Sequence, residues 1–143
     1  MHRSLICSGL AGLALATLVG SGAVAETVTY KATMNAKSQV PPNDTKGTGT
    51  AELTYDTATK TLTWTVTFAD LTGPATAAHF HGPAEPDKTA GVAVLIGNNP
   101  TSPAKGSATL TDAQAADLTT GRWYVNIHTA ANRPGEIRGQ VTK

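Results

Sequence analysis

Cysteine is almost absent from this chain: among 143 residues it occurs once, as Cys7. Nothing after that position can form a disulfide or supply a thiolate as nucleophile or metal ligand. Serine is also sparse beyond residue 25, and Ser38, Ser102 and Ser107 all lie outside any Gly-x-Ser-x-Gly turn. The sequence contains no glycine-rich phosphate loop, calcium-loop spacing or obvious pair of catalytic carboxylates. These absences argue against the common nucleophilic and phosphate-binding enzymes.

Aromatic residues are few, at 5% of the chain, and charge is balanced. Beyond residue 25, ten Lys and Arg face ten Asp and Glu, because the eleventh cation is Arg3. The charges of both signs are scattered without runs, so we expect neither nucleic acid nor an anionic membrane surface as a partner. Thr, Ala, Gly and Val are abundant, which favours a modest core between β-sheets over a helical bundle.

The first 25 residues have the features of a removable export signal. A basic start at Arg3 precedes an apolar run that ends in Ala23-Val24-Ala25. Small residues at the last and third-last of these positions predict a signal peptide over residues 1–25, with cleavage after Ala25. A retained membrane anchor is the alternative, but the run is short and rich in Gly, Ser and Ala. We expect residues 26–143 to form one exported domain, periplasmic or secreted, without membrane attachment after cleavage.

Alternation of apolar and polar residues recurs along the whole domain and predicts β-strands. The clearest case is Thr61–Phe68, in which Leu62, Trp64, Val66 and Phe68 share one face and threonines the other. About eight short strands are expected, separated by turns rich in Gly, Pro and Asn. Their ranges are 27–32, 49–55, 61–68, 77–81, 92–96, 106–110, 122–128 and 136–141. This spacing is typical of an antiparallel sandwich or barrel.

One segment departs from the strand pattern. Residues 111–118 begin with capping residues, continue with Ala and Gln, and stop before Gly121. They predict one short helix with Thr111 or Asp112 as its N-cap. Two loops, 36–48 and 97–105, are long and irregular.

Three histidines beyond the leader are the candidate site. His79 and His81 flank Phe80, and His128 ends the apolar-alternating strand near residue 122. Residues two apart in a strand share a face, so His79 and His81 project together, as do Tyr124, Asn126 and His128. If His128 lies close to the other two in space, three imidazoles can bind one ion and leave a coordination position open. Such a nitrogen site favours copper, with zinc as the second choice.

The same histidines have a simpler interpretation as hydrogen-bonded structural residues, because His-x-His alone is a weak motif. Other polar residues on these faces bear on the question. Asn126 or Glu136 could orient a histidine. Arg138, next to Gly139, could clamp an anion or carboxylate. The alternative, which we favour for Arg138, is a solvated or cross-strand-paired surface residue.

Together these segments resemble the chordin (CHRD) domain over roughly residues 27–141. The residues that carry the resemblance are Val40–Pro42, Leu71–Ala84, Leu110–Gln114, Trp123–Thr129 and Gly135–Gln140. The combination of both histidine motifs with the terminal GEIRGQ is specific. The resemblance implies an immunoglobulin-like, Greek-key antiparallel sandwich or barrel, in agreement with the strand count. It implies no particular chemistry, because a fold is not a function.

We therefore expect a non-enzymatic exported binding protein that holds copper, or zinc, through His79, His81 and His128. One alternative is a metal-free domain in which the histidines are structural and the loops 36–48 and 97–105 bind an extracytoplasmic protein or glycan. Another is an oxidoreductase that uses bound copper at an open position.

Overall fold

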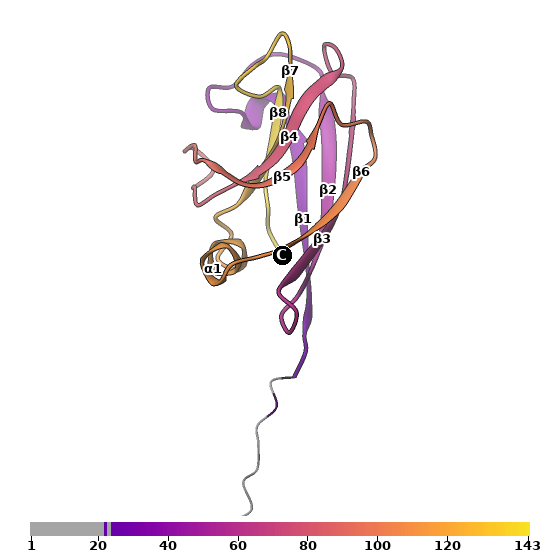
Figure 1. The fold of residues 1–143 in the computed structure, drawn as a ribbon. Coiled ribbons are helices and arrows are strands. Elements are labelled where there is room, and N and C mark those ends of the chain that lie inside the picture. The colour runs from indigo at the N-terminus through magenta and orange to yellow at the C-terminus, as the bar shows by residue number, and fades with distance from the viewer. Residues whose placement is uncertain (1–21, 23) are drawn as a thin grey trace, which may run out of the picture.

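The computed structural model describes residue 22 and residues 24–143, which form a single antiparallel sheet with one α-helix (Figure 1). The strands are β1 (Thr27–Asn35), β2 (Thr48–Asp56), β3 (Thr61–Ala69), β4 (Ala75–His81), β5 (Val92–Asn98), β6 (Ala104–Thr109), β7 (Tyr124–Thr129) and β8 (Ile137–Gln140). A short 3₁₀ turn, η1 (Ala36–Ser38), follows β1, and α1 (Asp112–Thr119) follows β6. All eight predicted strands are confirmed, and their ends shift by no more than three residues.

The sheet curls into a nearly closed barrel. Its strands are hydrogen-bonded in the order β5-β4-β7-β8-β1-β2-β3-β6. The two end strands, β5 and β6, lie next to each other, so the sheet almost meets itself. The all-β prediction is confirmed, and the sandwich-or-barrel alternative resolves to one continuous sheet. For function, the important neighbours are β4 and β7, because each carries part of the histidine set.

The inner face of the sheet forms the core, as the alternation predicted. Leu62, Val66 and Phe80 are fully buried, and Trp64 is almost so. The ring of Phe80 meets Trp64 edge-on, with ring centroids 5.4 Å apart. Because Phe80 points inward, its neighbours His79 and His81 must point to the outer face of β4.

The helix α1 is held by the caps that its sequence predicted. Thr111 is the N-cap: its side chain accepts a hydrogen bond from the backbone of Gln114, and the Gln114 side chain accepts one from the backbone of Thr111. This reciprocal capping box satisfies two backbone donors at the helix start. Gln114 also donates to the carbonyl of Ala93 on β5, which ties the helix to that end strand.

The predicted signal peptide, residues 1–25, lies almost wholly outside the described residues. Within the described part of the chain, no helix has the length and apolar character that crossing a bilayer requires.

Candidate metal centre

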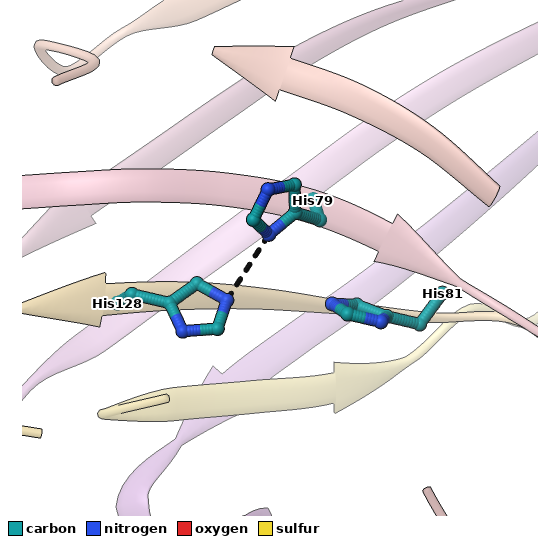
Figure 2. A group of neighbouring side chains, drawn as sticks. All are labelled: His79, His81 and His128. Carbon is teal, nitrogen blue, oxygen red and sulfur yellow. Dashed lines mark hydrogen bonds between the residues drawn. The ribbon is translucent and has the colours of Figure 1, made fainter. Parts of the chain in front are cut away.

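Neighbouring strands bring the three histidines together on the outer face of the sheet. β4 and β7 pair antiparallel, with His79 opposite Asn126 and Ala77 opposite His128. His79 and His128 are therefore diagonal neighbours across the pair, close enough for long or ring side chains to meet. His81 lies opposite Tyr124 at the end of β4. Figure 2 shows the rings of His79, His81 and His128 pointing toward one another.

The ring nitrogens converge to distances close to those of metal ligands. Nδ1 of His79 lies 3.1 Å from Nε2 of His128, and one nitrogen from each of the three rings lies within 4.8 Å of the others. Two nitrogens that bind one ion at about 2 Å are separated by roughly 3 Å. The His79–His128 pair already has this separation, whereas the nitrogen of His81 lies somewhat farther away. The predicted convergence of the three histidines is present.

A backbone carbonyl fixes the ring of His128. Its Nδ1 lies 2.7 Å from the carbonyl oxygen of Arg133, which can only accept, so Nδ1 carries a proton and donates it. A neutral ring then leaves Nε2 as a lone pair directed at His79. Metal-binding histidines usually donate their outer N–H in this way, which sets both the tautomer and the ring orientation.

His81 has the same arrangement on its outer nitrogen. Its Nδ1 lies 3.0 Å from the carbonyl oxygen of Ala90. Its ring stacks on Tyr124, with centroids 4.8 Å apart and planes 3° from parallel. The Tyr124 hydroxyl donates to the Ala90 carbonyl and accepts from the Ala90 N–H. The loop after β4 is therefore anchored to the strand that supplies His128. The inner nitrogen, Nε2, lies 3.0 Å from Oδ1 of Asn126.

Burial keeps two of the three rings neutral. Desolvation lowers the pKa of His79 to about 4, and the neighbouring His128 and His81 act in the same direction. Desolvation also lowers the pKa of His81, against the hydrogen bond to the Ala90 carbonyl that raises it. A neutral imidazole is the form that binds metals, so protons compete weakly for these nitrogens near neutral pH.

Arg138 is not the surface residue that we favoured from the sequence. Its side chain is 1% exposed, and its guanidinium carbon lies 3.5 Å from the centre of the Tyr124 ring. One guanidinium nitrogen donates to the carbonyl of Glu85, and none of the ion pairs among the described residues includes Arg138. The surface expectation is wrong because the loop after β4 covers this part of the polar face. A role in binding an anion stays a prediction.

Glu136 is also buried, but it does not support a histidine. Its carboxylate accepts hydrogen bonds from the backbone and hydroxyl of Thr72, from the Thr129 hydroxyl and from the Asn132 amide. Burial alone would raise the pKa of this carboxyl, but these hydrogen bonds outweigh it and lower the pKa. Its side chain turns toward Thr72, so the expected hydrogen bond to a histidine does not form among the described residues. Glu136 instead fixes the loop between β7 and β8, which carries the Arg133 carbonyl.

The donor set fits a transition metal. His79, His81 and His128 are the one group of three or more candidate ligands found among the described residues, and it contains no carboxylate or thiolate. Three imidazoles suit Cu(II) or Zn(II), and oxygen-preferring ions such as Ca²⁺ and Mg²⁺ are poor matches. Because all three ligands are neutral imidazoles, they would not offset the positive charge of a bound ion.

Fold and site together define an all-β antiparallel barrel domain with a polar cluster built on two adjacent strands. This chain belongs to the CHRD domain family, whose model matches residues 30–141. The sequence resemblance is thereby confirmed. Neither the curated proteins nor the solved structures gave a match to this chain.

Sequence reasoning missed the groups that hold the rings in place. Tyr124 was assigned to the correct face, but the alternation gave no reason to expect it to stack on His81. The carbonyls of Ala90 and Arg133 left no signal at all, because every residue carries one. A turn-rich segment next to each histidine was the sole indication.

Proposed function

We propose that this protein is an exported, non-enzymatic CHRD-domain protein that binds copper through His79, His81 and His128, with zinc as the second choice. The observation that carries the proposal is the 3.1 Å separation of the His79 and His128 nitrogens. The outer nitrogen of His128 donates to a carbonyl, so its inner nitrogen has a lone pair, and an ion can take the place of the His79 proton that this lone pair accepts.

The preference for copper follows from the ligands. For sites of nitrogen donors, affinity among divalent first-row metals rises to Cu(II) and falls again at Zn(II). No thiolate is present beyond Cys7 to favour zinc or Cu(I). Export from the cytoplasm, which the leader predicts, would also remove the protein from intracellular control of metal supply.

Calorimetric titration of Cu(II) and Zn(II) into the purified domain, residues 26–143, tests the proposal. We expect one ion per chain, micromolar or tighter binding, and copper ahead of zinc. His128→Ala should weaken copper binding at least about tenfold, or 1.4 kcal/mol, with unchanged β-type circular dichroism. Thr76→Ala, at an exposed position of the same sheet, is the matched control. Binding no tighter than millimolar in the parent domain would end the proposal.

Catalysis is a separate question from binding. Three protein ligands leave a position at which a copper ion can exchange a small ligand, which an oxidoreductase would need. The copper-loaded domain can be assayed for turnover of superoxide and peroxide. We expect rates no higher than those of free copper under the same conditions.

A metal-free interaction domain is the second candidate, and one surface feature favours it. Val92 and Leu95 on the end strand β5 are 56% and 50% exposed and pair with His81 and His79 of β4, so they offer apolar contact surface beside the histidines. A partner from an envelope extract whose capture survives chelation, but not shortening of the loops 36–48 and 97–105, would favour this function.

A further inference from the structure

Asn126 lies on the same face of the β4–β7 pair as the three histidines. It lies opposite His79 across the β4–β7 pair and two residues before His128 on β7. Its side chain is 3% exposed and reaches the third histidine, with Oδ1 3.0 Å from Nε2 of His81. Asn126 therefore contacts the inner nitrogen of His81, the one that points toward the other two rings (Figure 2).

The contact is on the wrong nitrogen for a residue that supports a metal ligand. A supporting group holds the outer nitrogen and leaves the inner one to the metal. For His81 the Ala90 carbonyl already holds Nδ1, and for His128 the Arg133 carbonyl does the same. Asn126 engages the lone-pair position itself. An ion could reach Nε2 of His81 only after this hydrogen bond opens.

The hydrogen bond between Asn126 and Nε2 of His81 requires Asn126 to be the donor. Because Nδ1 of His81 donates to Ala90, a neutral ring accepts at Nε2, and Asn126 meets it by turning its NH₂ group inward. This turn gives up a long 3.4 Å contact with the carbonyl of Pro134. It also brings the amide oxygen toward Gln39, whose buried Nε2 has no hydrogen-bond partner. The side-chain amides of Gln39 and Asn126 lie close together, because both are near the position that a Cβ on Gly135 would take.

The distances between ring nitrogens also set His81 apart from the pair formed by His79 and His128. The nitrogens of His79 and His128 are already 3.1 Å apart, whereas the three-nitrogen set spans up to 4.8 Å. The ring of His81 must leave Asn126 and move inward to complete the site. We propose that Asn126 and the metal ion compete for Nε2 of His81, so that Asn126 weakens metal binding and speeds release. This inference rests on the proposed function and describes how that same site is regulated.

A double-mutant cycle with His81 tests the competition. Copper and zinc affinities are measured for the parent domain, Asn126→Ala, His81→Ala and the double variant. The loss of one competing hydrogen bond should raise the affinity of Asn126→Ala by about two- to tenfold. In the His81→Ala background the same change should have no effect, because the nitrogen that Asn126 blocks is gone. Transfer of copper to a chelator should be slower from Asn126→Ala than from the parent.

The outcomes separate the two proposals. If the parent binds metal but Asn126→Ala binds it equally or more weakly, Asn126 is a supporting residue and the competition is refuted. A gain in affinity that persists without His81 refutes the competition as well. If the parent binds no metal, the proposed function itself fails. Asn126→Ser, which keeps a polar side chain but cannot reach His81, should reproduce the gain in affinity if Asn126→Ala does not fold.

Discussion

Nδ1 of His79 and Nε2 of His128 lie 3.1 Å apart although 49 residues separate them in the sequence. The two residues are diagonal partners on β4 and β7, and neither loop flexibility nor a third element is needed to bring them together. The sheet itself therefore sets the spacing of this nitrogen pair. His81 is different, because its inner nitrogen contacts Asn126.

This difference predicts unequal roles for the three ligands. His79→Ala and His128→Ala should each lower copper affinity more than His81→Ala, because each removes half of the preset pair. We expect losses of about 100-fold for the first two variants and about tenfold for the third, in line with 2.7 and 1.4 kcal/mol. Competition titrations against a coloured copper chelator measure all three, with Thr76→Ala as the control. An equal or larger loss for His81→Ala would contradict the assignment.

Desolvation of His79 and His81 also predicts how the stability of the metal-depleted domain depends on pH. The pKa of His79 is lowered in the folded state from 6.5 to about 4, and that of His81 is lowered too, both chiefly by desolvation. Between pH 6.5 and pH 4 the unfolded chain therefore binds more protons than the folded one. The free energy of unfolding should fall as pH drops through this window, and the contribution of the histidines to that fall should level off below it.

Urea denaturation of chelator-treated protein at several pH values checks this slope. The double variant His79→Gln/His81→Gln has no imidazole at either position, so its stability should fall less over the same window. The difference between parent and variant isolates the histidines from the carboxylates, which titrate in both. Parallel curves for the two proteins would show that burial does not depress these pKa values.

Glu136 should contribute strongly to stability although it does not touch a histidine. Glu136→Ala leaves the donors of Thr72, Thr129 and Asn132 without their shared acceptor. We expect a loss of about 3 kcal/mol in the free energy of unfolding, measured by urea denaturation. Glu52→Ala, at an exposed position on β2, should change it by less than about 0.5 kcal/mol. Copper binding by Glu136→Ala should also weaken, because the loop that holds the Arg133 carbonyl loosens.

Arg138 should stabilise the domain mainly by packing on Tyr124 and not by its charge. Burial lowers the pKa of this guanidinium, and the negative charge of Asp87 opposes that effect. Arg138→Met keeps the length of the side chain and removes the buried charge, so we expect a change within about 1 kcal/mol. Arg138→Ala loses both packing and the ring contact and should cost about 2–3 kcal/mol.

Chemical denaturation of both Arg138 variants distinguishes packing from charge. A loss in Arg138→Met as large as in Arg138→Ala would mean that the charge itself is required. That result would support the prediction that Arg138 binds an anion.

The strands and the face on which each candidate residue lies were predictable from the sequence. The alternation around Phe80 placed His79 and His81 together, and the alternation around Val125 placed Asn126 with His128. The burial of Arg138 and Glu136 was not predictable, because alternation treats a polar face as solvated. Here that face is covered by loops through contacts such as Asn43 with the Glu136 carbonyl, 93 residues away. The alternation of neighbouring residues does not reveal contacts between residues so far apart in the sequence.

The carbonyls of Ala90 and Arg133 orient two of the three rings through their peptide groups, not through their side chains. Mutations that replace these side chains leave the orienting acceptors in place as long as the loop paths persist. The loops that carry Ala90 and Arg133 can therefore change in sequence, and their surface chemistry can change too, while the histidine cluster stays the same. Related domains could thus evolve different residues around this site and retain the geometry of its histidines.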